Sequence, residues 1–154
     1  MRGKNIPKRK IAPDPKFSRL DIAKFINRIM ERGKKTTAQG LVYGAFEYIS
    51  EKSKQDPLEV YDTAIRNVAP NLEVKGKRIG GANYQVPIVV TGDRKIALAH
   101  RWILEAAKSR KGASLRVKLG EELLAAAKGE GTAMKKREDV HKMAEANKAF
   151  AHFA

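Results

Sequence analysis

The sequence lacks cysteine altogether, and it lacks several other features that mark particular classes of protein. Without cysteine there is no disulfide framework, no thiolate zinc site and no cysteine nucleophile. The longest apolar runs, such as residues 123–127, fall far short of the ~18 residues that a membrane span requires. No apolar stretch follows the basic N-terminus, so we expect no secretory signal. These absences favour a cytoplasmic protein with no membrane partner.

Acidic residues are also scarce. Only 17 Asp and Glu stand against 32 Lys and Arg, which gives a net charge of +15 and an isoelectric point near 10.1. Charges of one sign repel one another in a folded chain, so this imbalance indicates a polyanionic partner. The hydrophobic fraction of 42% over 154 residues is enough for the core of one globular domain. We therefore expect a globular protein that binds nucleic acid.

The positive charge is concentrated in two blocks. Residues 1–35 carry 12 basic and 3 acidic side chains, and residues 93–118 carry 8 and 2. If the fold brings the blocks together, they form one basic face. Residues 1–17 are predicted to be a basic arm, which is either a disordered solubilising tail or a segment that orders on a phosphate backbone. Residues 18–154 are assigned to a single helical domain.

Helical spacing of apolar residues predicts a mainly α fold, with about six helices in a compact bundle. The first helix has a cap signal over residues 18–21 and ends at Gly33, and Thr36 or Thr37 caps the second. Asp56, followed by proline, caps the third. The last three begin near residues 93, 114 and 132. The predicted buried faces include Ile22, Phe25, Ile26, Ile29 and Met30 in the first helix, Trp102 and Ile103 in the fourth, and Val140, Met143 and Ala144 in the sixth.

Between the third and fourth helices the pattern changes to that of a β-hairpin. Residues 72–79 and 84–91 are rich in β-branched residues, and apolar side chains alternate from Tyr84 to Val90. The glycine-rich segment 80–83 lies between the two runs, so we expect a protruding hairpin at about residues 72–91. Pro87 restricts its strand to an edge, and a lone hairpin needs the helices or a ligand to support it.

Basic side chains recur opposite the apolar faces of two predicted helices. The first helix carries Lys24, Arg28, Arg32 and Lys35, and the fourth carries Arg94, Arg101 and Lys108 at a spacing of seven. The alternative is a solvated charged face, but these helices carry few acidic residues to balance the positive charges. Contact with phosphates is therefore favoured.

Two loops and the hairpin tip offer further places for an anion. Lys34 and Lys35 precede the second helix, and Arg110 and Lys111 precede the fifth, where backbone N–H groups suit a phosphate. Beside the tip, Tyr84 either stacks on a base or packs in a local apolar cluster, and the sequence favours neither alternative.

Signs of an enzyme are poor. The sequence contains no H-E-x-x-H, G-x-S-x-G or Walker-type motif and no cluster of carboxylates, so we expect no metal site and no cofactor. His100 is expected to be a hydrogen-bonded core residue, and His141 to pair with Glu145 on a helix surface. We therefore predict that the chain is not an enzyme.

Several stretches together carry a resemblance to a known family. They are RKI at residues 9–11, PDPKF at 13–17, GKKTTA at 33–38, GGANYQVP at 80–87, ALAHRWI at 97–103 and GTAMKKREDVHKMAEANKAF at 131–150. In this order and spacing, over roughly residues 8–153, the chain resembles the family of bacterial small-subunit ribosomal protein seven. The resemblance implies a helical core with one protruding hairpin and a primary binder of small-subunit ribosomal RNA (rRNA) that organises the 3′ major, or head, domain.

The resemblance also implies where each RNA lies. With the basic loop before the fifth helix added, the expected rRNA-binding residues are Lys8, Arg9, Lys10, Lys24, Arg28, Lys34, Lys35, Lys75, Lys77, Arg94, Arg101, Lys108, Arg110 and Lys111. The hairpin tip and last helix are expected near messenger RNA and exit-site transfer RNA, through Arg78, Gly80, Gly81, Asn83, Tyr84, Lys135, Lys136, Arg137, His141, Lys142 and Asn147. The implied protein partners are small-subunit proteins nine, eleven and thirteen.

Two other classes of protein share part of this pattern. An architectural DNA-binding protein would share the charge and the helices, but no dimerisation surface is evident. A nuclease would need a cluster of metal-binding carboxylates, and the acidic residues are scattered along the sequence.

Overall fold

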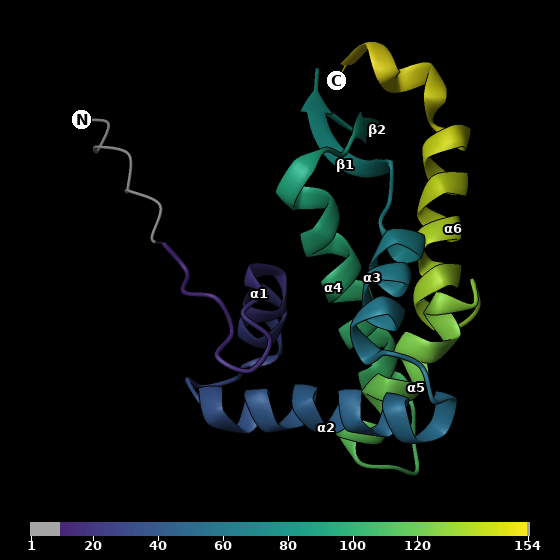
Figure 1. The fold of residues 1–154 in the computed structure, drawn as a ribbon. Helices are drawn as coiled ribbons and strands as arrows, with labels where there is room; N and C mark the ends of the chain where they lie inside the picture. The colour runs from purple at the N-terminus through teal and green to yellow at the C-terminus, as the bar shows by residue number, and fades with distance from the viewer. Residues whose placement is uncertain (1–9, 154) are drawn as a thin grey trace. The chain divides into compact units, whose positions relative to one another are not determined.

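The computed structural model describes residues 10–153, which form two compact units. The first unit ends at Gln39, and the second begins at Gly40. The elements are α1 (Leu20–Ile29), α2 (Lys35–Ser53), α3 (Pro57–Val68), β1 (Leu72–Ile79), β2 (Ala82–Val89), α4 (Gly92–Ser109), α5 (Leu115–Ala127), α6 (Thr132–Ala146) and the 3-10 helix η1 (Lys148–Phe153), as Figure 1 shows. The expectation of a mainly α fold with six α-helices and one hairpin is confirmed.

A turn around Asp14 leads into α1 and replaces the predicted cap. The Asp14 carboxylate accepts hydrogen bonds from the backbone N–H groups of Lys16 and Phe17, both 3.0 Å long. Ser18 has a positive φ of 52° and donates its N–H to the Asp14 carbonyl, so Arg19 becomes the N-cap residue. The prediction that the cap signal begins at Ser18 is therefore wrong, because Asp14 has already fixed the turn.

Helix α1 ends earlier than predicted. Met30 is extended, with ψ of 129°, and Arg32 and Gly33 have positive φ values of 52° and 75°. Gly33 thus lies in the turn after the helix and is not the residue that ends it. Helix α2 then begins at Lys35, and the Lys34 carbonyl accepts from Ala38 N–H, so neither Thr36 nor Thr37 is the cap.

The third helix begins as the sequence predicts. The Asp56 side chain accepts a hydrogen bond of 3.0 Å from Leu58 N–H, and Pro57 takes the first helical position, where no N–H is needed. Tyr61 on this helix is buried, and its hydroxyl lies 2.8 Å from Nε2 of His100 on α4. His100 is only 2% exposed, so the expectation of a hydrogen-bonded core histidine is confirmed.

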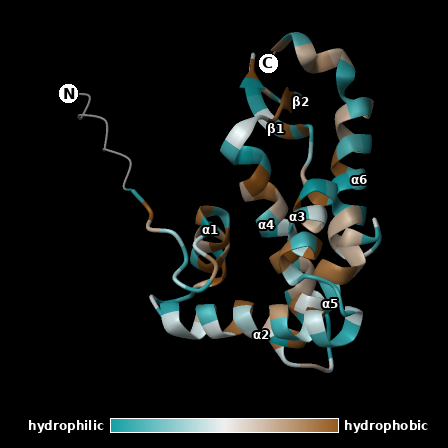
Figure 2. Cartoon of the chain, viewed as in Figure 1, coloured by the Kyte–Doolittle hydropathy of each residue, from teal (hydrophilic) through white to brown (hydrophobic). Residues whose placement is uncertain are grey.

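The core of the second unit lies among α2, α3, α4 and α5. Figure 2 shows brown apolar stretches that alternate with teal polar ones along these helices. The apolar side chains that are fully or almost fully buried include Val42, Phe46, Ile49, Ala64, Val68, Trp102, Ile103, Leu119 and Leu123. Within the described residues, no helix combines the length and apolar character needed to cross a membrane.

Helix α6 buries a narrower face than the sequence predicts. Ala133, Met134 and Ala144 are buried, whereas Met143 is 49% exposed. The prediction of an inward Met143 is wrong. The buried positions 133 and 144 lie nearly above one another on the helix, and Met143 is about 100° away from Ala144.

The hairpin is tighter than expected and does not stand alone. Strand β2 begins at Ala82 rather than Tyr84, which leaves only Gly80 and Gly81 between the strands. Their φ values of 57° and 89° fit a two-residue turn that glycine adopts without strain. In Figure 1 the hairpin lies beside α6, with η1 near its free end. The prediction that helices support the hairpin is confirmed.

Two helical glycines should respond to alanine in opposite directions. A Cβ at Gly120 on α5 would lie 2.7 Å from Tyr48 Cδ1 and 3.1 Å from the Ala45 carbonyl oxygen, so Gly120→Ala should lower the free energy of unfolding by about 1–3 kcal/mol. A Cβ at Gly40 on α2 would meet nothing within 4 Å, so Gly40→Ala should raise it by about 0.5–1 kcal/mol. Urea denaturation measures both, and a shift of the same sign in the two variants would contradict this packing.

Candidate nucleic-acid interface

The first unit presents cations on a helix and in the turn that follows it. Because α1 ends at Ile29, only Lys24 and Arg28 of the predicted stripe lie on that helix. Arg32 lies in the turn and Lys35 begins α2, so the prediction of one four-residue helical stripe is wrong. Lys8 and Arg9 lie outside the described residues.

The turn before α2 keeps its basic side chains exposed. Lys34 and Lys35 directly precede the first turn of α2, where backbone N–H groups lack helical partners. Neither side chain forms a hydrogen bond or ion pair with another described residue, and the same holds for Lys10 and Arg28. Two ammonium groups at a helix start suit a phosphate.

The predicted stripe on α4 is divided by an ion pair. Arg101 is half-buried and forms no hydrogen bond or ion pair with another described residue, and Lys108 is exposed in the last turn. Arg94, in contrast, binds Glu73 of β1, with Nη2 2.9 Å and Nε 3.2 Å from one carboxylate oxygen. The pattern of charges along α4 does not reveal this partner, because Glu73 lies 21 residues earlier in the sequence, on a strand.

Glu73 is the acidic centre of the hairpin base. It is 8% exposed, and its second oxygen accepts from Lys75 Nζ at 2.9 Å. Burial raises the pKa of this carboxyl, but the hydrogen bonds and positive charges of Arg94 and Lys75 outweigh burial and hold the pKa below its ordinary 4.5. Glu73 is therefore ionised at neutral pH, with two cations on one carboxylate.

Arg110 has a structural role that the sequence did not reveal. Its guanidinium donates to Oε2 of Glu122, which is fully buried, with Nη2 2.6 Å and Nε 2.9 Å away. The other oxygen of Glu122 accepts from Ala133 N–H at 2.9 Å, in the first turn of α6. Since Glu122 lies three residues after Leu119 on the apolar face of α5, its burial could have been predicted from the spacing. Lys111 is exposed and unpaired among the described residues.

At the hairpin tip the predicted contact residues are exposed, except for Tyr84, which packs against other aromatic rings. Arg78, Gly80, Gly81 and Asn83 are exposed. The Tyr84 ring lies 5.2 Å from that of Phe150 and 5.5 Å from that of Phe153, measured between centroids. Lys77 Nζ donates to the Phe153 carbonyl at 2.6 Å. Of the two alternatives for Tyr84, the structure supports the local apolar cluster.

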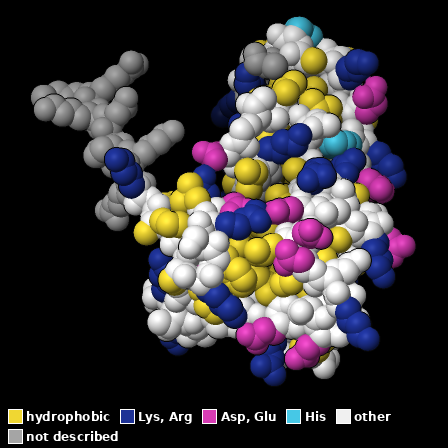
Figure 3. Space-filling view, in the orientation of Figure 1, with side chains coloured by type: hydrophobic (Ala, Val, Ile, Leu, Met, Phe, Trp, Pro, Cys, Tyr) yellow, Lys and Arg dark blue, Asp and Glu magenta, His cyan; other side chains and the backbone are white. Residues whose placement is uncertain are grey.

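Helix α6 divides its predicted residues into exposed and engaged groups. Lys135, Lys136 and Lys142 are exposed, with no side-chain partner among the described residues. Arg137 Nη1 donates to the Asn67 carbonyl in the last turn of α3, and Asn147 Nδ2 donates to the Met143 carbonyl. Along the right-hand edge of Figure 3, where α6 lies, blue and magenta side chains alternate.

His141 joins α6 to the segment before β1. Its Nε2 accepts from Asn71 N–H at 3.2 Å, rather than pairing with Glu145 as the sequence suggested. Burial and the positive charges of Arg137 and Lys95 lower the pKa of His141 from its ordinary 6.5. The neutral ring that these conditions favour is the form that can accept the hydrogen bond.

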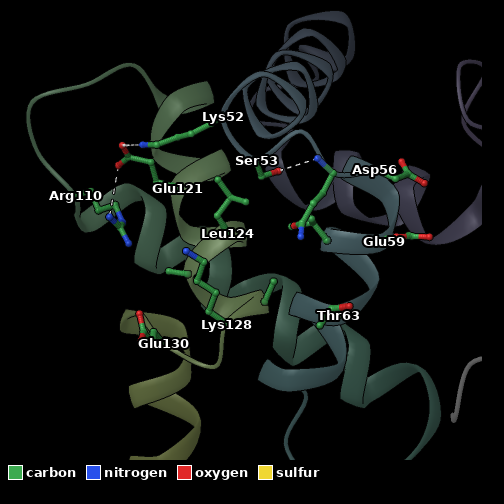
Figure 4. A pocket seen from close by; sticks show the side chains of 14 residues that line it. Lys52, Ser53, Asp56, Glu59, Thr63, Arg110, Glu121, Leu124, Lys128 and Glu130 are labelled. Atoms are coloured by element: carbon green, nitrogen blue, oxygen red, sulfur yellow. Dashed lines mark hydrogen bonds and ion pairs between the residues drawn. The ribbon is translucent and has the colours of Figure 1, made fainter.

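A cleft in the second unit shows where an anion would not bind well. The ends of α2 and α5, the start of α3 and neighbouring loop residues line it (Figure 4). Four carboxylates lie on its walls, from Asp56, Glu59, Glu121 and Glu130. Glu121 lies 3.7 Å from Lys52 and 3.6 Å from Arg110, so two of the cations in the cleft already face a carboxylate. In residues 10–153, no three His, Asp or Glu side chains gather as a metal site.

Arg110 and Lys111, which the sequence treats alike, should differ in stability measurements. Arg110→Met leaves the buried Glu122 carboxylate without its cation and should lower the free energy of unfolding by about 3 kcal/mol. Lys111→Met should change it by less than about 0.5 kcal/mol. Urea denaturation of both variants checks this, and equal effects would show that the Glu122 contact contributes nothing to stability.

The contact of His141 predicts a pH dependence. Because the pKa of His141 is lower in the folded chain than in the unfolded one, the unfolded chain takes up its proton first as the pH falls below 6.5. Stability should therefore decline in that range, and His141→Gln, which keeps an acceptor, should remove this part of the decline. Thermal denaturation between about pH 7.5 and about pH 5.5 measures it. An unchanged slope in the variant would refute the assignment.

Comparison with known proteins identifies the family. The sequence profile described as "Ribosomal protein S7p/S5e" matches residues 1–148. The chain is 59% identical over 152 residues to the small ribosomal subunit protein uS7 of Pseudothermotoga lettingae, with 99% of this chain and 98% of the relative covered. It is 57% and 55% identical to the proteins of the same name from Aromatoleum aromaticum and Azoarcus sp., in each case over 99% of this chain and 97% of the relative. The chain therefore belongs to the ribosomal protein S7p/S5e family.

Proposed function

We propose that this chain is an rRNA-binding component of the small ribosomal subunit, where it organises the head domain and lies near messenger RNA and exit-site transfer RNA. Its family consists of structural ribosomal proteins, so the prediction that it is not an enzyme is confirmed. The relatives named above are small-subunit proteins, and the cytoplasmic ribosome is the proposed location. Small-subunit proteins nine, eleven and thirteen are the proposed neighbours.

One observation supports this function most directly. Both units carry cations that are expected to bind rRNA and that have no hydrogen bond or ion pair to another described residue. In the first unit these are Lys10, Arg28, Lys34 and Lys35, and in the second they are Arg101 and Lys111. An unpaired cation on a chain of charge +15 gains most from a phosphate, because it releases counterions without first breaking an internal pair.

The expected contacts near the exit site divide in the same way. Arg78 at the tip and Lys135, Lys136 and Lys142 on α6 are available for a phosphate. Tyr84, Arg137, His141 and Asn147 already contact other parts of the chain. We propose that the first group contacts messenger and transfer RNA and that the second group maintains the shape of that surface. Residues 1–17 are proposed as an arm that orders on rRNA, and residues 18–154 as the domain that carries these surfaces.

A general DNA-binding function is the competing hypothesis, and one titration separates the two. The full chain should bind a folded fragment of small-subunit head rRNA more tightly than a random duplex of equal charge at every salt concentration. Equal affinity for both across the titration would exclude the specific function.

Within that titration, Arg101 has a matched control. Arg101→Met should weaken binding and make the slope of log affinity against log salt shallower by about one unit, because one phosphate contact is lost. Lys128→Met removes the same charge beside the acidic cleft and should leave the slope unchanged. An unchanged slope in a folded Arg101→Met protein would show that Arg101 is only solvated.

A further inference from the structure

Glu73 brings together two cations from different elements. Lys75 lies two residues along the same strand, whereas Arg94 lies in the first turn of α4. Each cation donates to a different oxygen of the one carboxylate, Lys75 at 2.9 Å and Arg94 at 2.9 Å and 3.2 Å. Without this carboxylate, two like charges at such a short separation would repel each other.

The two cations keep much of their donor capacity. The Lys75 and Arg94 side chains are 52% and 47% exposed, while that of Glu73 is only 10% exposed. Lys75 uses one of its three N–H groups on Glu73, and Arg94 leaves its Nη1 group unused there. The cluster retains one net positive charge and several N–H donors that can reach solvent.

We propose that Glu73 is a positioning residue, which holds Lys75 and Arg94 side by side as a clamp for one phosphodiester of rRNA. The two non-bridging oxygens of a phosphodiester would accept from the Lys75 ammonium and the Arg94 guanidinium together. This inference rests on the proposed rRNA-binding function and deepens it. In this arrangement the carboxylate of Glu73 strengthens the binding of a polyanion, because it positions the two cations.

Glu122, another buried carboxylate of the second unit, shows why the Glu73 cluster is distinctive. Glu122 binds one guanidinium and one backbone N–H, so its charge is used to join α5 to the start of α6. Its cation, Arg110, is only 32% exposed, and Arg110 also faces Glu121 at 3.6 Å. One cation between two carboxylates has no positive charge left for a phosphate, whereas two cations on one carboxylate have.

Substitution of Glu73 separates positioning from simple charge. Glu73→Gln removes one negative charge and so raises the net charge by one, which by itself predicts tighter binding to RNA. A positioning role predicts the opposite, with affinity about tenfold weaker and a shallower salt slope, because the clamp loses its geometry. Glu51→Gln adds the same charge at an exposed residue of α2 that has no side-chain partner among the described residues, and it should bind as tightly as the parent chain or slightly more tightly.

A double-mutant cycle separates positioning from a purely structural role. The full chain, Glu73→Gln, the pair Lys75→Met with Arg94→Met, and the triple variant are titrated with the folded head-rRNA fragment after circular dichroism has verified folding. If Glu73 acts through the two cations, its positioning effect disappears once they are absent, so the triple variant should bind as tightly as the pair or, from the change of charge alone, slightly more tightly.

Each outcome of the cycle decides the matter. Binding by Glu73→Gln as tight as that of the parent chain, or tighter, would overturn the inference. A triple variant weaker than the pair would also overturn it, because Glu73 would then act through the fold alone. Failure of the parent chain to prefer the rRNA fragment over a random duplex would overturn the proposed function and the inference together, whereas failure in the variants alone leaves the proposed function standing.

Discussion

The arrangement of α5, α6 and the hairpin in the second unit depends on one buried carboxylate, that of Glu122. A fully buried charge must be paired, and Glu122 satisfies this need with Arg110 from the segment after α4 and the Ala133 N–H at the start of α6. Gly131, the N-cap residue of α6, offers no side chain, so Glu122 takes over the capping of that helix. Helix α6 in turn supports the hairpin, and the hairpin supports η1. The placement of the proposed exit-site surface thus depends on an ion pair at the start of α6.

Carboxylates also decide which cations remain available to bind a phosphate. Glu122 and Glu121 engage Arg110, and Glu73 gathers Lys75 and Arg94. Other cations bind carbonyl groups, as Lys77 does at Phe153. Among the described residues of the two basic blocks, Lys10, Arg28, Lys34, Lys35 and Lys111 are exposed and have no side-chain partner within the chain, so the net charge of +15 is not a uniform coat. It consists of cations that stabilise the fold and cations that are available for phosphates.

Local chemistry made much of this fold predictable from the sequence. The start of α3 follows from Asp56 and Pro57, the buried histidine from its place on an apolar face, and the hairpin from alternation around two glycines. One error was local, because the turn around Asp14 moves the start of α1. Other errors arose where distant residues decide the outcome, since packing against the hairpin and α4 selects the buried face of α6 and leaves Met143 exposed. The pairing of Glu73 with Arg94 depends on how the hairpin meets α4, which no local pattern encodes.

We propose that rRNA binds the unpaired cations of the basic blocks and avoids those beside the acidic cleft. Lysine acetylation rates, read by mass spectrometry on the free chain and on its complex with folded head rRNA, test it most directly. We expect strong protection of Lys34, Lys35 and Lys111 in the complex, with Lys52 and Lys128 reacting as they do in the free chain. Protection of Lys52 and Lys128 with no change at the other three would contradict it.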